Sequence, residues 1–176
     1  CRRQRQMCIR DRPLPALEYL ATHLKGILVV DEAYIDYALD GDGMAASFLG
    51  KLDAYPNVII LRTFSKSYSM AGARLGLMFA HVELINHMNK VKDSYNVNAL
   101  TQLAGEAALL DRDYFRWLVG ETIKQRKALE AACKGFGWTW PTSDANFLLV
   151  EVGSAAKAGA LYERCRDGGV LVRYWG

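Results

Sequence analysis

The 176-residue sequence has few cysteines and no long apolar run. Its four cysteines, Cys1, Cys8, Cys133 and Cys165, form no CxxC pair and show no spacing typical of metal ligands. This pattern favours free thiols in a reducing compartment, so we expect a cytoplasmic protein without a metal ion. No apolar stretch approaches the roughly 20 residues that a membrane-spanning helix needs, and no signal-peptide core is present. We therefore expect no membrane partner.

The sequence also has little excess charge of either sign, with 22 Lys and Arg against 19 Asp and Glu. Residues 1–12 carry a net charge of +4, so residues 13–176 carry a net charge of −1. The body of the chain lacks the basic character of nucleic-acid-binding domains, and we expect no nucleic-acid partner. We interpret residues 1–12 as a disordered basic lead-in, with a nucleic-acid or targeting arm as the alternative.

The clearest chemical signal lies in residues 62–76. Lys66 follows the hydroxyl side chains of Thr63 and Ser65, and Arg74 stands eight residues further on. A lysine becomes a useful nucleophile when its surroundings lower its pKa and hold it still. Hydroxyl groups and a guanidinium suit the oxygens of a phosphate. The combination predicts a Schiff-base lysine beside the phosphate of pyridoxal phosphate.

A second signal is the apolar run at residues 26–30, which ends in Asp31. Such a run is typical of a strand buried on both faces. In open α/β sheets, ligands bind at the carboxyl ends of the strands, where Asp31 would stand. A carboxylate at this place could face the pyridine nitrogen of the cofactor and keep it protonated. Tyr34, three residues later, could donate to the phenolic oxygen of the cofactor.

The hydrophobic pattern predicts strands and helices that alternate and then a smaller α+β part. We expect helices at residues 14–25, 44–55, 83–91, 100–110, 113–134 and 155–166, the fourth of them largely buried. We expect strands at residues 26–31, 57–62, 75–80, 138–140, 146–152 and 170–175. The prediction is an α/β fold, with part of a mostly parallel large domain at 13–125 and a partial small domain at 126–176. We also expect the sequence to be incomplete at both ends.

From residue 13 to residue 176 the sequence resembles the fold-type-I pyridoxal-phosphate-dependent aminotransferases, and among them the histidinol-phosphate aminotransferases. Five segments carry this resemblance: Val30 to Tyr37, Ser65 to Gly76, Tyr95 to Asn98 followed by Gln102, Ser143 to Phe147, and Leu171 to Arg173. The first two are shared by many aminotransferases, and the others narrow the choice. The phosphate turn, ring-stacking aromatic and Asn-Pro-rich loop that such enzymes carry ahead of Asp31 have no counterpart here.

The resemblance implies that Lys66 forms the Schiff base and moves the proton, that Asp31 pairs with the pyridinium nitrogen, and that Tyr34 contacts the ring hydroxyl. The cofactor phosphate would be held by Ser65, Arg74 and, more weakly, Thr63.

On the substrate side, the resemblance implies that Arg173 binds an anionic end of the substrate and that Asn146 also contacts it. The implied reaction moves an amino group between histidinol phosphate and 2-oxoglutarate, with glutamate as the other partner of the exchange. A homodimer is implied as well.

Three alternatives remain open. The first is another fold-type-I enzyme, such as an amino-acid aminotransferase or a phosphothreonine-type decarboxylase, because these share the core motifs. The second is a non-catalytic fragment or binding module. The third is a P-loop ATPase, whose magnesium-binding strand can also end in Asp-Glu, but residues 1–176 contain no Gly-x-x-x-x-Gly-Lys-Ser/Thr run.

Overall fold

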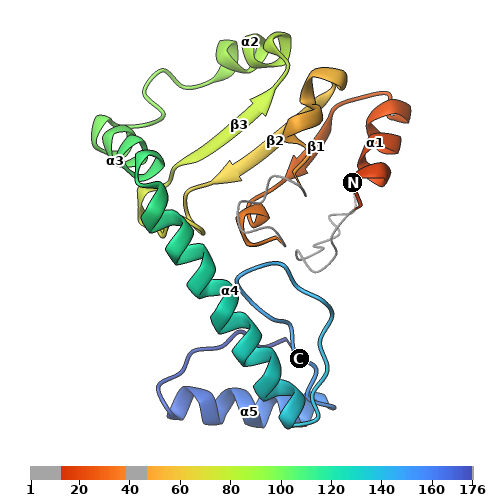
Figure 1. Ribbon diagram of the computed structural model, residues 1–176, viewed down its shortest axis with the longest axis vertical. Coiled ribbons are helices and arrows are strands. Elements are labelled where there is room, and N and C mark those ends of the chain that lie inside the picture. The colour runs from red at the N-terminus through yellow and green to blue at the C-terminus, as the bar shows by residue number, and fades with distance from the viewer. Residues whose placement is uncertain (1–12, 39–46, 176) are drawn as a thin grey trace.

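The computed structural model describes residues 13–38 and 47–175, so the predicted lead-in at 1–12 and the start of the helix at 44–55 lie outside it. Its centre is a three-stranded sheet in the order β1-β2-β3 (Figure 1), formed by β1 (Leu28–Asp31), β2 (Val58–Thr63) and β3 (Gly76–Ala80). β1 and β2 run parallel, whereas β3 runs antiparallel to β2. All three strands were predicted from the sequence, and their ladder brings the ends of β1 and β2 to one edge.

One face of the sheet packs against α1 (Leu14–His23) and the short 3-10 helix η2 (Leu49–Ala54). Phe48, Val58 and Ile60 are fully buried there, and burial of such side chains is the main favourable term in folding. The helix predicted at residues 44–55 appears only as η2, because residues 49–54 form a 3-10 rather than an α-helix.

The opposite face of β1 is open, which corrects the prediction of a strand buried on both faces. Val29 is 53% exposed, and the four residues of β1 alternate between half-buried and exposed. The physical reason is that α1 and η2 cover one face only, and a side-chain period of two leaves every second residue of the strand uncovered.

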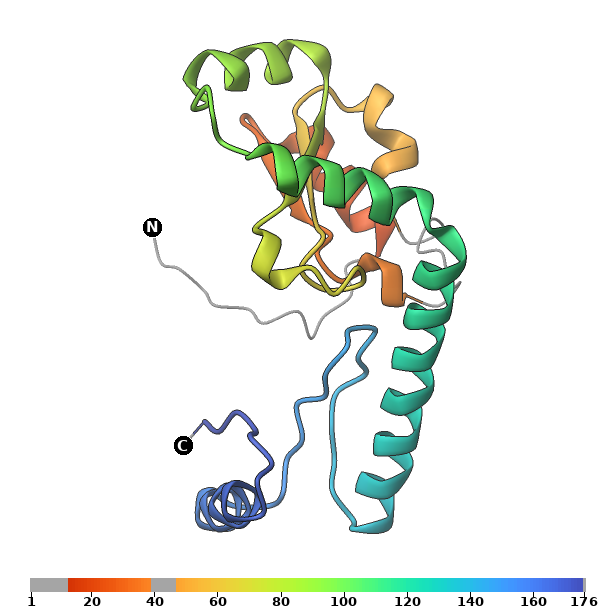
Figure 2. The ribbon, with the colours of Figure 1, turned by 90° about the vertical axis from the view of Figure 1, so that its left-hand side faces the viewer.

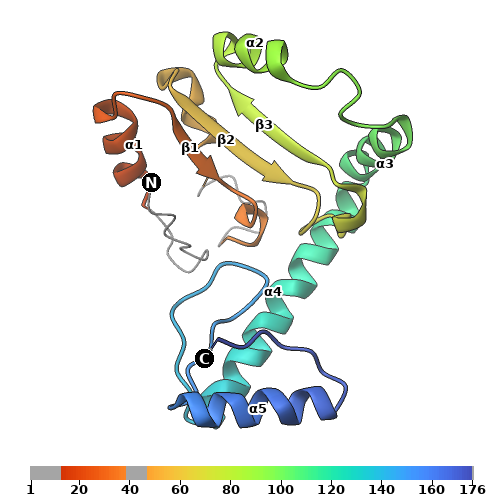
Figure 3. The ribbon, with the colours of Figure 1, turned by 180° about the vertical axis from the view of Figure 1, so that it is seen from behind.

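Three helices follow the sheet (Figures 1 and 3): α2 (Val82–Val91), α3 (Ala99–Leu110) and α4 (Arg112–Gly135). Asn98 and Asp111 cap the last two, since their side chains accept from the backbone N–H of Thr101 and Tyr114. The prediction that 100–110 is largely buried is wrong, because Thr101 and Gly105 are the buried residues of α3. Apart from the half-buried Ala108, the other residues of α3 are exposed.

A second core cluster joins the sheet region to α4. It consists of Tyr37 in the short helix η1 (Ile35–Tyr37) and of Phe115 and Val119 in α4. Tyr34 and Tyr68 pack against it from the loops after β1 and β2. These contacts fix the segment after β1 against the longest helix of the chain, and this segment carries one half of the candidate site.

Beyond α4 the chain continues to α5 (Ala155–Asp167), which lies at the same end of the molecule as the C-terminal end of α4, with the segment that joins the two helices between them (Figure 2). The strands predicted at 138–140, 146–152 and 170–175 are not formed, and within the described residues the single bridge joins Thr139 to Glu151. A strand needs a partner for its backbone groups along its whole length, and apart from this bridge these segments pair with no other described strand. Among residues 13–38 and 47–175, no helix combines the length and apolar character that a membrane crossing requires.

Candidate active site

The predicted cofactor residues lie on the segments that follow β1 and β2 at one edge of the sheet. Asp31 is the last residue of β1 and pairs with Leu61, and the backbone N–H of Glu32 donates to the carbonyl of Leu61 at 2.8 Å. Because the two strands are parallel, the segment with Tyr34 and the loop with Lys66 leave the sheet on the same side. This is the edge at which open α/β sheets bind their ligands.

Lys66 and Tyr34 meet directly at this edge. The Nζ atom of Lys66 lies 5.3 Å from the centroid of the Tyr34 ring, within the range of a cation–π contact. The loop around Lys66 is closed by hydrogen bonds from Met70 N to the carbonyl of Phe64 at 3.0 Å and from Ser69 N to the carbonyl of Lys66 at 3.1 Å. Both side chains are half-buried, so the amine is held yet reachable.

The Asp31 carboxylate is exposed on the open side of β1. Its Oδ1 atom accepts from the backbone N–H of Ala33 at 3.0 Å, a local turn that orients the side chain. The hydrogen bond occupies one oxygen of a group that can accept several. The carboxylate can therefore receive a further proton donor from a ligand.

The residues predicted to bind the cofactor phosphate, Thr63, Ser65 and Arg74, lie at the end of β2 and in the connection between β2 and β3. Thr63 pairs with Gly76, and the N–H of Phe64 donates to the carbonyl of Leu75 at 3.1 Å. Ser65 and Arg74 are the next residues on each side of this ladder.

The side chains of Thr63 and Arg74 differ in their contacts. The Thr63 hydroxyl accepts from Ser65 N at 3.1 Å, so it shapes the loop. Arg74 adopts a left-handed conformation with φ of +54° and is exposed, with one guanidinium nitrogen donating to the carbonyl of Ala71 at 3.1 Å. The guanidinium keeps four further N–H donors for an anion.

Together these groups fit pyridoxal phosphate by the chemistry of the donor set. The amine of Lys66 suits its aldehyde, the Asp31 carboxylate its ring nitrogen, and the phenol of Tyr34 its ring oxygen. The hydroxyl of Ser65 and the guanidinium of Arg74 suit its phosphate.

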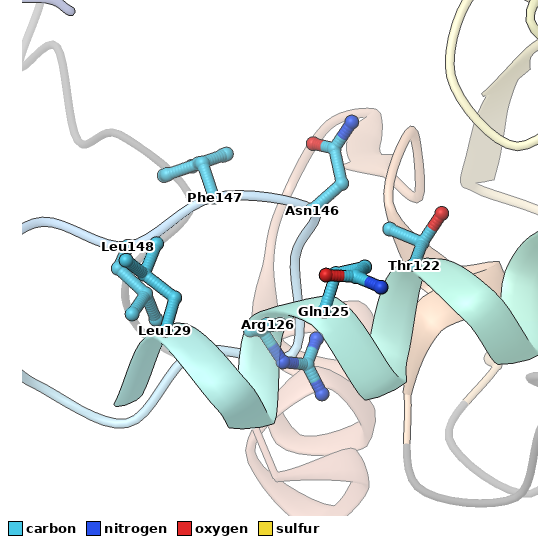
Figure 4. Close-up of a pocket in the computed structure, with 7 residues that line it drawn as sticks. All are labelled: Thr122, Gln125, Arg126, Leu129, Asn146, Phe147 and Leu148. Atoms are coloured by element: carbon cyan, nitrogen blue, oxygen red, sulfur yellow. The ribbon is translucent and has the colours of Figure 1, made fainter. Parts of the chain in front are cut away.

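The structure places the two predicted substrate residues differently. Asn146 lines a pocket of about 170 Å³ on α4 (Figure 4), with Thr122, Gln125, Arg126, Leu129, Phe147 and Leu148. The Phe147 ring packs edge-on against the ring of Tyr34 at 5.4 Å, so the Asn146 loop reaches the edge of the site. Arg173 is exposed beside α5, where its neighbour Tyr174 stacks on Tyr162. Within residues 13–38 and 47–175, no side-chain hydrogen bond or ion pair joins Arg173 to the site.

Sequence reasoning missed a buried ion pair beneath this edge. The carboxylate of Glu32 accepts from Nε and an Nη atom of Arg62 at 3.1 and 2.9 Å. It also accepts from the Ser47 hydroxyl at 2.8 Å and from Phe48 N at 2.7 Å. The available signal was the alternation along two neighbouring strands, because residues adjacent to Asp31 and Thr63 must point to the opposite, covered face.

Tyr37, next to the site in the second core cluster, gives a pH-dependent prediction. Burial, followed by the Asp36 carboxylate and Tyr34, raises the pKa of Tyr37 to about 12. The folded protein thus keeps a phenolic proton that the unfolded chain loses near pH 10, its ordinary value of about 10. Ionisation of Tyr37 leaves stability unchanged below that pH, and it lowers the free energy of unfolding as the pH rises from about 10 to about 12.

We expect Tyr37→Phe to remove this pH-dependent loss of stability. Urea unfolding between about pH 9 and about pH 11.5 should show that the wild type loses more stability with rising pH than the variant does. The other tyrosines and the lysines are present in both proteins, so their contributions to the pH dependence of stability cancel in the comparison. Two curves that stay parallel over this range would contradict the assignment.

Comparisons with known proteins agree with this geometry. A family model described as aminotransferase class I and II matches residues 9–176. Histidinol-phosphate aminotransferase from Syntrophotalea carbinolica is 39% identical over 166 residues, which cover 93% of this chain and 45% of that protein. The enzyme of the same name from Parabacteroides distasonis is 42% identical over 151 residues, covering 85% of this chain and 41% of that protein.

Solved structures show the same likeness. Histidinol-phosphate aminotransferase from Sinorhizobium meliloti, crystallised in complex with pyridoxal-5'-phosphate, superposes with a TM-score of 0.85 at 29% identity. The match covers 98% of this chain and 47% of that one, so the chain spans about half the length of these relatives. The predicted α/β class, as part of an aminotransferase fold, is confirmed.

Proposed function

Because the chain belongs to the class I and II aminotransferases, we propose that the protein carrying it uses pyridoxal phosphate to move an amino group between histidinol phosphate and 2-oxoglutarate, a step of histidine biosynthesis. The observation that carries this proposal is the contact of Lys66 Nζ with the Tyr34 ring, at 5.3 Å, beside the carboxyl end of β1. The names of relatives at 39% and 42% identity support the choice of substrate.

Pyridoxal phosphate, when bound, supplies a sink for the electron pair left on the substrate carbon. Lys66 would bind the cofactor through Nζ and then, as a free amine, carry a proton between the two reacting carbons. Asp31 would hold the proton on the ring nitrogen, and the Tyr34 hydroxyl would donate to the ring oxygen. These roles need the three side chains at one edge, which is where the two segments after β1 and β2 lie.

The phosphate would be bound by the Ser65 hydroxyl and the Arg74 guanidinium, with Thr63 orienting the loop through Ser65 N. Arginine is suited to this task because it presents several donors in a fixed planar fork. Asn146 would contact the substrate from the loop after α4, and Arg173 would bind its phosphate after a movement of residues 168–175 towards the site.

The test is a spectrum followed by a substrate panel on the complete protein that carries this chain. Addition of pyridoxal phosphate should give visible absorbance, and borohydride should then fix the cofactor on the peptide that contains Lys66. Histidinol phosphate should be the best amino donor when compared with aromatic amino acids, aspartate and glutamate. Labelling of another lysine would refute the site, whereas a better donor from the panel would refute only the substrate.

The assembly and location extend the proposal. We propose a cytoplasmic homodimer whose domains divide at about residues 125 and 126, within α4. Leu100 at 80% and Leu110 at 76% exposure support a further covering layer over α3. Light scattering on the complete protein should give the mass of two chains, and the mass of one chain would contradict the dimer.

A further inference from the structure

A hydrogen bond with no assigned role joins the two segments that carry the candidate site. The first segment carries Asp31 and Tyr34 and continues to Asp36, and the second carries Lys66 and continues to Ser67. The Ser67 hydroxyl donates to Oδ2 of Asp36. Ser67 is fully buried, with 0% of its surface exposed, and Asp36 is half-buried, so the donor end of this bond is shielded from water. The contact therefore links Ser67, the residue after Lys66, to the segment that carries Asp31 and Tyr34.

The acceptor side of this bond is firmly anchored. Asp36 is the middle residue of η1, and the next residue, Tyr37, is 2% exposed between Phe115 and Val119 of α4. The backbone of η1 is closed by donation from Tyr37 N to the carbonyl of Tyr34 at 3.1 Å. Asp36 consequently has little freedom to move relative to α4.

The donor side is held at the following residue. The Tyr68 ring stacks on Phe115 of α4 at 4.6 Å and lies 4.8 Å from Phe64. Both η1 and the end of the Lys66 loop thus rest on the same aromatic side chain of α4. Between these two packing contacts, the hydrogen bond of Ser67 to Asp36 joins the two segments directly beside Lys66.

We propose that Asp36 and Ser67 act as a positioning pair that fixes the Lys66 side chain against Tyr34. This inference rests on the proposed function of Lys66. A proton-carrying amine must lie within hydrogen-bond reach of the reacting atoms, and small misplacements cost much of the rate. The pair touches neither substrate nor cofactor in this role. It restricts the backbone that carries Lys66.

The test compares Ser67→Ala with Asp36→Ala and Asp36→Asn in the complete protein. Both alanine variants should lower kcat about tenfold and weaken the visible circular dichroism of the bound cofactor, while KM for the amino donor changes less than about twofold. Asp36→Asn keeps an oxygen acceptor for Ser67 and should stay within about threefold of the wild type. The double alanine variant should be no worse than either single one, because both remove the same bond.

Cys133→Ala is the matched control. Cys133 is 3% exposed near the far end of α4, so its truncation removes buried contacts without touching either segment. It should lower the unfolding temperature and leave kcat and the circular dichroism unchanged. If Ser67→Ala and Asp36→Ala behave like this control, the positioning role is overturned although Lys66 still binds the cofactor. If borohydride labels a lysine other than Lys66 in the wild type, the proposed function falls and the inference falls with it.

Discussion

Lys66→Ala in the complete protein is expected to abolish amino transfer and the visible absorbance of the bound cofactor. The amine is the one group in the candidate site that would serve both as the attachment point and as the proton carrier. A general acid–base group contributes roughly 10²- to 10⁴-fold to a rate, and loss of the covalent route adds to this. The measurements are steady-state turnover with histidinol phosphate and an absorbance scan after dialysis with pyridoxal phosphate.

Lys124→Ala is the control for this experiment. Lys124 is an exposed lysine on α4, with 71% of its side chain accessible and an ion pair to Glu121 one turn earlier. Its removal should leave turnover and absorbance unchanged. Retention of the absorbance in Lys66→Ala, together with borohydride labelling at another position, would show that the amine of Lys66 is not the attachment point.

Arg62→Met is expected to lower the free energy of unfolding by about 3–5 kcal/mol. Arg62 has 18% of its side chain exposed, and Glu32 has 4%, with an N···O distance of 2.9 Å. Removal of the guanidinium leaves the Glu32 carboxylate buried with Ser47 and Phe48 N as its donors. An uncompensated buried charge is costly, because the carboxylate has lost its hydration and gains no counter-charge. Urea unfolding of both proteins near neutral pH measures the difference.

Two further variants distinguish the effect of breaking a buried ion pair from the effect of removing an arginine side chain. Arg116→Met removes the same side chain from an exposed pair with Asp113, which is fully exposed, and should change stability by less than about 1 kcal/mol. The double variant Glu32→Gln, Arg62→Met removes the orphaned charge and should recover much of the loss. Equal effects of Arg62→Met and Arg116→Met would contradict a special role for the buried pair.

Much of the architecture follows from local sequence patterns. The apolar run that ends at Asp31, the strand before Thr63 and the helical periodicity of residues 113–134 all appear as elements close to their predicted bounds. These elements are determined by side-chain periodicity and by end signals such as Asp111, the N-cap of α4, which act over a few residues. The chemical character of the Lys66 loop is local in the same sense.

The predictions that failed concern partners far away in the sequence. Residues 138–140, 146–152 and 170–175 have the composition of strands, yet backbone pairing needs a second strand in register, and only Thr139 and Glu151 pair. Likewise, the burial of β1 and of α3 depends on whether another layer covers them. Composition records that a segment can be buried, but the packing partner decides whether it is.

The sequence by itself determined the order of the five helices and the three paired strands of the described residues, the family and the set of reactive groups around Lys66. The tertiary structure alone decided which groups meet: Glu32 with Arg62 and Ser47, Asp36 with Ser67, and Phe147 with Tyr34. The reason is physical. A reactive side chain is a property of one position, whereas a buried hydrogen bond needs two positions, 15 to 31 residues apart in the first two cases, to be brought together by the folded chain.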